Sequence, residues 1–150
     1  MIKKFKELAI VVLFWNDSEK TIKCLKSLFN QKKQKFHIVL VDNNSEEIYS
    51  KKILNWLKKS KVNFIQIKKN FILKKNNKIK LFYIKNKINY GYGLGHNSGY
   101  KFCLSNNYDY IARIDNDMVV PNKLMFSLIQ RLKKFVLNIR YNSVKRHCLL

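Results

Sequence analysis

The sequence predicts an α/β fold, with a doubly wound, mostly parallel sheet and helices on both faces. Three observations predict it. Apolar runs of strand length recur along the chain, segments with helical spacing of apolar residues alternate with them, and acidic or glycine-rich segments follow directly after the runs. This alternation favours parallel strands joined by right-handed crossovers. Ligands of such sheets bind where the strands end, so the acidic and glycine-rich segments form the candidate site.

The first half of the chain predicts two strands, each followed by a helix. Residues 8–14 form a continuous apolar run, typical of a strand covered on both faces. Residues 16–19 offer N-cap candidates and a first-turn acid for a helix that reaches about Asn30. A second strand over 36–41 ends at Asp42, and Ser45 is the expected cap of the next helix.

The middle of the chain offers two strand-like segments, residues 62–67 and 79–84. One is expected to be the third core strand and the other an arm of an inserted hairpin that turns at Asn76-Asn77. The segment 79–84 is the preferred core strand. Three of the chain's four glycines then lie within residues 91–95, which predicts a turn with few Cβ atoms that enters a helix at about His96.

The last predicted strand covers residues 108–114 and ends in Asp115-Asn116-Asp117. Residues i and i+2 on extended backbone point to the same side, so the two carboxylates can converge on a hard cation such as Mg²⁺, together with phosphate oxygens. The alternative is a turn rich in Asp and Asn that ends a strand. A final helix is expected with Pro121 at its first position and with an apolar face that includes Leu124, Leu128, Met125 and Ile129.

Asp42, the glycine segment and His96 each have two interpretations. Asp42 could accept hydrogen bonds from a base or ribose, or it could cap the next helix. The glycine segment lacks both the G-x-G-x-x-G and the P-loop pattern, so it is either a plain loop or a place where backbone approaches a ligand closely. A lone His96 near a helix start is more often a cap or a surface residue than a metal ligand.

Charge raises the question of a polyanion partner. The formal net charge is +22, which promotes adhesion to nucleic acid or to an anionic membrane surface. Lysine outnumbers arginine by 27 to 4, however, whereas recognition of phosphate depends heavily on the planar arginine fork. Compositional bias therefore explains the charge better than a dedicated site, and no specific nucleic-acid partner is expected. Peripheral membrane contact through a basic amphipathic helix starting at Leu124 remains open.

Cysteine usage and the N-terminal segment favour a cytoplasmic protein. Cys24 and Cys103 lie in helical patterns and are expected to be buried free thiols, and no C-x-x-C pair occurs. The apolar run from Leu8 to Trp15 is far too short to span a bilayer. It is followed by no cleavage site of the small-x-small type.

Four stretches together make the chain resemble the family 2 inverting glycosyltransferases of the nucleotide-sugar (GT-A) fold, especially their rhamnosyltransferase-like branch. They are residues 10–16 with 24–31, residues 38–45, residues 89–99, and residues 108–117. The resemblance implies that Asp42 meets the base or ribose of a nucleoside-diphosphate sugar donor and that Trp15 and Asn16 line the same pocket. It implies that Gly91, Gly93 and Asn97 pass beside the donor, that Asp115 lies near the ribose or sugar, and that Asp117, with Asp115, holds Mg²⁺ or Mn²⁺ on the diphosphate.

The family's general base, a carboxylate that deprotonates the acceptor hydroxyl, normally follows the metal motif by many tens of residues. None of the residues after Asp117 is Asp or Glu. The resemblance thus implies an incomplete donor-binding domain over residues 1–132 and an atypical basic tail over 133–150. It also implies a glycan or lipid-linked acceptor, and a cytoplasmic protein for which peripheral contact with the inner face of the plasma membrane is open. The alternatives are an inactive remnant and a non-enzymatic basic nucleic-acid-binding module.

Overall fold

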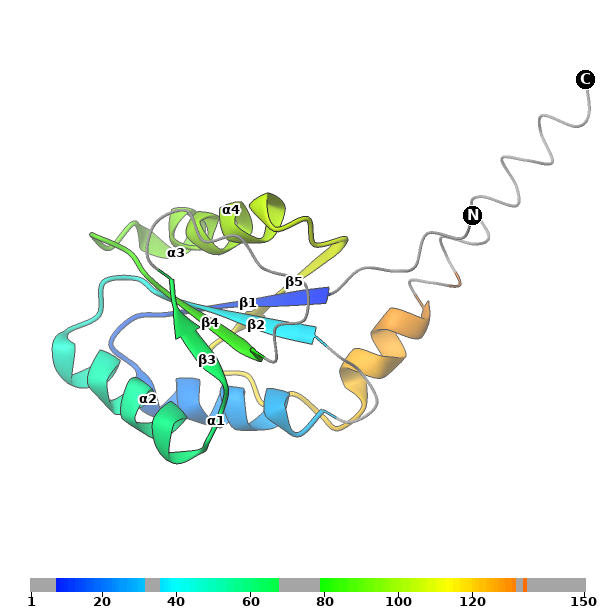
Figure 1. Ribbon diagram of the computed structural model, residues 1–150, viewed down its shortest axis with the longest axis horizontal. Helices are drawn as coiled ribbons and strands as arrows, with labels where there is room; N and C mark the ends of the chain where they lie inside the picture. Colours follow the sequence, from blue (N-terminus) through cyan, green and yellow to red (C-terminus); the bar gives the residue numbers. More distant parts are fainter. Residues whose placement is uncertain (1–7, 32–35, 68–78, 132–133, 135–150) are drawn as a thin grey trace, which may run out of the picture.

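The computed structural model describes residues 8–31, 36–67, 79–131 and 134. Five strands form one sheet in the order β3-β4-β2-β1-β5, and every neighbouring pair is parallel (Figure 1). The strands are β1 (Leu8–Phe14), β2 (Phe36–Asp42), β3 (Phe64–Gln66), β4 (Leu81–Lys85) and β5 (Tyr110–Asp115). The helices are α1 (Ser18–Phe29), α2 (Glu47–Lys59), α3 (Gly91–Gly95) and α4 (Asn97–Ser105), and residues 124–131 are also helical. The predicted α/β class is confirmed.

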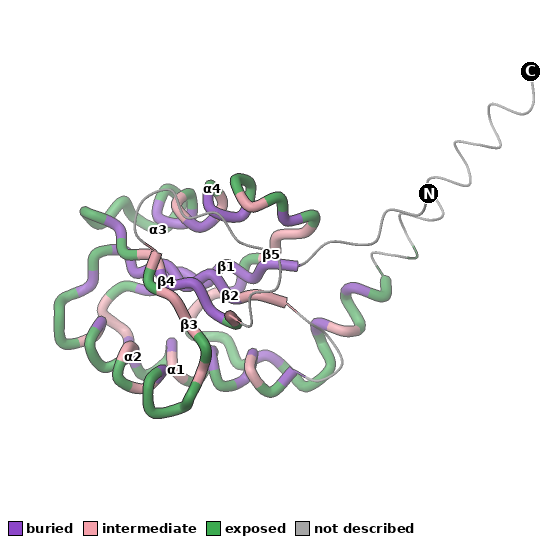
Figure 2. Tube along the Cα trace, in the orientation of Figure 1, coloured by how far each residue is buried: buried purple, intermediate pink, exposed green. Residues whose placement is uncertain are grey.

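Helices cover both faces of the sheet because β1 is apolar on both faces. Alternate residues of a strand point to opposite sides. On one side Ile10 and Phe14 join a cluster with α1, α2 and helical residues 124–131. On the other side Val11 joins a smaller cluster with Phe102 of α4. In Figure 2 β1 is buried along its whole length, whereas buried and exposed residues alternate along the helices.

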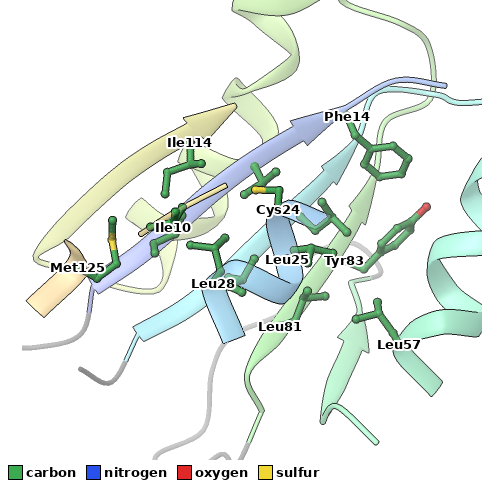
Figure 3. Close-up of a cluster of buried hydrophobic side chains, with 14 of the residues drawn as sticks. Ile10, Phe14, Cys24, Leu25, Leu28, Leu57, Leu81, Tyr83, Ile114 and Met125 are labelled. Carbon is green, nitrogen blue, oxygen red and sulfur yellow. The ribbon is translucent and has the colours of Figure 1, made fainter. Parts of the chain in front are cut away.

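The larger of the two clusters fixes α1 against the sheet. Figure 3 shows Cys24, Leu25 and Leu28 of α1 pointing toward side chains of the strands, with Leu57 of α2 beside them. Leu25 and Leu28 are spaced for one face of a helix, and each is at most 1% exposed. Full burial of such a side chain contributes roughly 1.5–3 kcal/mol. This packing holds the first turn of α1 at the end of β1, next to the candidate site.

Gly99 allows α4 to approach the sheet closely. A Cβ built at this position lies 2.6 Å from Val11 Cγ1 and 3.0 Å from Val41 Cγ2. We expect Gly99→Ala to destabilise the protein by about 1–3 kcal/mol through overpacking, measured by urea denaturation. Gly93→Ala is the matched control, because its Cβ meets no atom within 4 Å and alanine favours helix by about 1 kcal/mol. An equal response of the two variants contradicts the packing argument.

The structure corrects the hairpin predicted for the middle of the chain. β4 pairs with β2 and is the core strand, as expected, but β3 pairs with β4 in parallel and extends the sheet at its edge. Two parallel neighbours cannot be arms of one hairpin. Asn76 and Asn77 lie outside the described residues.

Three smaller predictions were also wrong. The N-cap of α2 is Glu46, not Ser45, and it makes no side-chain cap bond. Pro121 precedes two turn residues and is not the first helical position, because helix begins at 124. Of the predicted apolar face, Met125 and Ile129 are buried whereas Leu124 and Leu128 are exposed. Within the described part of the chain, no helix combines the length and apolar character that a membrane crossing needs.

Candidate functional site

Polar residues from four strands meet at the carboxyl edge of the sheet. Because the strands are parallel, their last residues lie at one edge. Hydrogen bonds join the segments that follow: Asn43 after β2 bonds to Asn86 after β4, and Asn16 after β1 bonds to Ser45 after β2. The predicted clustering of the acidic and glycine-rich segments at one edge is thus confirmed.

Asp42 is the most enclosed residue of this edge. Its side chain is fully buried, and its Oδ1 accepts from the backbone N–H of Ser45 at 2.7 Å. Its Oδ2 accepts from Ser50 Oγ at 2.5 Å and from the Tyr83 hydroxyl. Burial and then this hydrogen bond raise the pKa of the Tyr83 phenol. Lys85 Nζ lies 3.8 Å from Oδ2. In this conformation the carboxylate therefore binds protein groups that order the loop between β2 and α2.

Asn43 organises the glycine segment. Its Nδ2 donates to Asn89 Oδ1 at 2.7 Å and to the carbonyl of Gly91 at 3.0 Å. Its Oδ1 accepts from Asn86 Nδ2 at 2.9 Å and from the backbone N–H of Tyr90 at 3.2 Å. All four hydrogen-bonding positions of the amide are thus used. Sequence reasoning missed Asn43, although it directly follows Asp42 in a stretch that carries the family resemblance.

The glycine segment is helical, not an open turn. Gly91 adopts a φ of +73° and starts α3, while Gly91 and Gly93 are both exposed. Only glycine fits at position 95 beside the Asn43 side chain, because a Cβ there would lie 2.9 Å from Asn43 Nδ2. Asn97 is exposed at the start of α4. Backbone of this segment is therefore accessible at the carboxyl edge.

His96 lies between the two short helices and is buried, with 1% exposure, which contradicts the expected cap or surface position. Its Nδ1 lies 2.8 Å from the carbonyl of Tyr92, so Nδ1 carries the proton in the neutral ring and Nε2 is an acceptor. The ring packs against Tyr92 and Tyr100. His96 Nε2 has no hydrogen-bond partner among the described residues. The histidine is a packing centre between α3 and α4.

Asp115 bridges β5 and the glycine segment. Its Oδ1 accepts from the Tyr92 hydroxyl, and that hydrogen bond raises the pKa of the Tyr92 phenol. Arg113 Nε lies 4.0 Å from the same oxygen, and the guanidinium stands 5.3 Å from the centre of the Tyr92 ring. Tyr92 was not predicted as a site residue, because the sequence pattern of this segment consists of the glycines on either side of it.

Asp117 lies in a turn, so the extended i, i+2 geometry predicted for the acidic pair is wrong. The N–H of Met118 bonds to the carbonyl of Asp115 at 3.1 Å, which places Asn116 and Asp117 at the centre of a β-turn. Met118, which follows the turn, is exposed. Asn116 Nδ2 donates to Thr21 of α1 at 3.0 Å, and this bond fixes the turn.

Both carboxylates nevertheless act on one group, the thiol of Cys24. Burial, followed by Asp117 and then Asp115, raises its pKa to about 11. The thiol also lies 3.7 Å from the backbone carbonyl of Asp115, which places Cys24 of α1 beside the end of β5. Cys24 and Cys103 are buried free thiols, as predicted. Among the described residues, no group of three or more His, Cys, Asp or Glu side chains is placed to hold a metal ion.

Trp15 and Asn16 continue this edge from β1. Trp15 is 55% exposed. Asn16 has a φ of +50°, a left-handed conformation that Asn tolerates better than most residues. Its side chain exchanges two hydrogen bonds with Glu46, through Nδ2 to Oε1 at 3.1 Å and through Oδ1 from the backbone N–H at 2.8 Å. The turn is thereby tied to the start of α2, and the indole is left facing solvent.

Comparison with solved structures shows the same fold. S. aureus TarS 1–349 in complex with UDP-GlcNAc superimposes with a TM-score of 0.62 at 19% identity, over 85% of this chain and 31% of that chain. The mannosyltransferase PcManGT from Pyrobaculum calidifontis, in complex with GDP-Man and Mn²⁺, gives a TM-score of 0.58 at 12% identity, over 81% of this chain and 30% of that one. The chain thus spans about a third of the length of these structures. Comparison with curated proteins gave no match.

The family model described as glycosyl transferase family 2 matches residues 9–146. The match runs from the second residue of β1 through β5 and the acidic turn that follows it. The chain belongs to glycosyl transferase family 2.

Proposed function

We propose that this chain is the donor-binding part of a glycosyltransferase that takes a sugar from a nucleoside-diphosphate donor. The observation that carries the proposal is the polar carboxyl edge of the sheet, where Asp115, Asp117 and the backbone of the glycine segment are accessible together. Such an edge is the ligand-binding place of open parallel sheets. The relatives in the previous subsection bind UDP-GlcNAc and GDP-Man, which agrees with a nucleotide sugar as the ligand.

The acidic pair fits a divalent cation that is shared with a diphosphate. Asp115 is 42% exposed and Asp117 is exposed, so both carboxylates can meet a ligand from solvent. Two carboxylates are what Mg²⁺ commonly takes from a protein, with water and phosphate oxygens completing its octahedron. When bound, Mg²⁺ or Mn²⁺ supplies charge stabilisation to the departing nucleoside diphosphate. Tyr92 and Arg113 would hold the Asp115 carboxylate in place, as partners behind metal ligands do.

The other site residues bind and orient the donor in this proposal. Trp15 offers an exposed ring for the base, while Asn16 fixes the turn that carries it. Gly91 and Gly93 expose backbone without a side chain, and Asn97 adds an amide at the start of α4. Asp42 acts here through Ser45 and Tyr83, which it positions at the base-binding end of the edge. A direct contact between Asp42 and the base requires that one of these bonds opens.

The finer parts of the proposal concern the acceptor and the location. We propose an inverting transfer to an envelope or lipid-linked glycan, carried out on the cytoplasmic side with peripheral membrane contact. The proposal assigns no general base to this chain. The exposed apolar residues Met118 and Val119 directly follow the acidic turn and offer an apolar surface to the acceptor.

Calorimetric titration of the 150-residue chain with UDP and with GDP tests the proposal. We expect one of the two to bind in the presence of Mn²⁺, and we expect Asp117→Ala or removal of the metal to weaken that binding at least about tenfold, because even the loss of a partner behind a metal ligand costs about 10–100-fold. Glu47→Gln is the matched control, because it also removes one exposed negative charge and pairs only with Lys51 among the described residues. Binding that ignores both EDTA and Asp117→Ala contradicts a metal-assisted site.

A further inference from the structure

The acidic residues of this chain are segregated at one edge of the sheet. Of its nine Asp and Glu residues, seven lie at the ends of β1, β2 or β5 or in the segments directly after them. They are Asp17, Glu19, Asp42, Glu46, Glu47, Asp115 and Asp117. Glu7 lies outside the described residues, and Asp109 precedes β5. At the opposite edge, where the strands begin, lysines therefore have few acidic neighbours. This segregation is not visible in the sequence, where lysines occur in every segment.

A groove of about 570 Å³ opens at this amino edge. It lies where α1 and α2 end and where the chain enters β3 and β4. Its lining residues are Lys26, Phe29, Asn30, Trp56, Ser60, Lys61, Val62, Asn63 and Lys80. We call it the basic groove, since three of these residues are lysines and none is acidic. The volume falls within the range of roughly 300–1,000 Å³ that is usual for small-molecule sites.

The three lysines lack acidic partners in the described part of the fold. Lys26, Lys61 and Lys80 form no ion pair with any described carboxylate. Lys26 stands in the last turn of α1, where a cation is favourable, but the cap bonds at the C-terminal ends of α1 and α2 come from backbone N–H groups. Asn30 N–H bonds to the carbonyl of Lys26, and Val62 N–H bonds to that of Leu57. Three unpaired ammonium groups around one concavity repel one another, and an anion bound between them relieves that repulsion.

Two aromatic rings supply an apolar wall to the same groove. Phe29 and Trp56 are half-buried and pack with ring centroids 6.2 Å apart. Their inner faces join the core while their outer parts line the groove. A ligand that fits this lining has an anionic group next to a ring or an alkyl portion. Lysine binds phosphate well as a point charge, and Trp and Phe accept both rings and alkyl chains.

We propose that the basic groove is a second ligand site, which binds a phosphate ester with its anionic group at Lys26, Lys61 and Lys80 and its apolar part against Trp56 and Phe29. The site is separate from the donor edge, because the groove lies at the amino ends of the strands and the donor edge at their carboxyl ends. Two sources share this chemistry: a small soluble phosphate ester and the headgroup of an anionic phospholipid.

Trp56 can report on the groove directly. The chain has two tryptophans, so Trp15→Phe at the opposite edge leaves Trp56 as the only tryptophan, which can be excited selectively over tyrosine. In this background we would titrate phenyl phosphate, phenol as the uncharged probe, and vesicles of phosphatidylcholine with or without phosphatidylglycerol, all at one fixed salt concentration. We expect phenyl phosphate or the phosphatidylglycerol vesicles to shift Trp56 emission, and phenol and neutral vesicles to leave it unchanged at the same concentrations.

Matched triple variants separate the groove from the net charge. Lys26→Gln/Lys61→Gln/Lys80→Gln removes the groove charges, and Lys87→Gln/Lys101→Gln/Lys123→Gln removes three exposed charges elsewhere. We expect the first to weaken binding at least roughly tenfold and the second to change it no more than about twofold, with both variants folded by circular dichroism. A response to phenyl phosphate identifies a soluble ester, and a response to phosphatidylglycerol vesicles alone identifies a headgroup. Equal losses in the two variants, or no Trp56 response to either anion, overturn the proposal.

Discussion

Asp42→Ala is expected to lower the free energy of unfolding by about 3–5 kcal/mol, the loss typical of removing one partner from a buried charged network. The variant leaves the N–H of Ser45 and the hydroxyls of Ser50 and Tyr83 without their acceptor in a region closed to water. Each unsatisfied buried donor costs about 1–3 kcal/mol. Lys85 also loses its nearest carboxylate at 3.8 Å. A loss of this size is a large fraction of the 5–15 kcal/mol that is usual for a domain.

Urea denaturation of the variant series measures this effect. Asp117→Ala is the control for removing an exposed carboxylate and is expected to stay within about 0.5 kcal/mol of the parent. Tyr83→Phe removes one donor and keeps the ring against Phe14, so it is expected to cost about 1.5–3 kcal/mol, the value of a hydrogen bond to a charged group. If Asp42→Ala and Asp117→Ala unfold at the same urea concentration, the buried carboxylate does not hold the β2–α2 loop.

The sheet could be predicted from the sequence because its central strands are apolar on both faces. The run that became β1 was predicted with its observed limits, and β2 with one residue fewer. Such runs are typical of parallel strands covered by helices. The start of α1 followed a local signal as well, because the side chain of Asp17 accepts from the N–H of Lys20. Where local residue preferences and the apolar pattern indicate the same element, that element can be predicted from a single sequence.

The location of the candidate site was predicted from the sequence, but the contacts between its residues were not. The partner that buries Asp42 is Tyr83, which stands 41 residues away on β4, and no local pattern reveals such a pairing. β3 is three residues long. A parallel edge strand of this length and an arm of a hairpin have the same short apolar run in the sequence, so the sequence does not distinguish them. His96 is buried because two tyrosines from α3 and α4 enclose it. The two tyrosines lie four residues before and after His96, a spacing that places all three on one side of a helix. The sequence predicted a turn at α3, so this contact was not expected.

Asn43→Asp is expected to destabilise the protein by about 2–4 kcal/mol and to loosen the glycine segment in particular. The substitution keeps the shape of the side chain but replaces two donors by an oxygen that faces Asn89 Oδ1 and the carbonyl of Gly91. Two attractive contacts thus become repulsive ones in a residue that is 2% exposed, and unpaired buried groups cost about 1–3 kcal/mol each. Hydrogen exchange followed by NMR measures the effect, with faster exchange expected at Tyr90 and Gly91.

The neighbouring residue provides a matched control for this prediction. Asn44→Asp makes the same chemical change at an exposed position whose φ of +63° suits Asp as well as Asn, and we expect it to leave exchange in residues 90–95 unchanged. Because Tyr92 of this segment donates to Asp115, loosening at Asn43 should also reach the acidic turn and reduce the affinity for a Mn²⁺–nucleotide complex. A variant that loses stability uniformly, with no excess exchange in residues 90–95, would show that Asn43 supports the sheet and does not organise the donor edge.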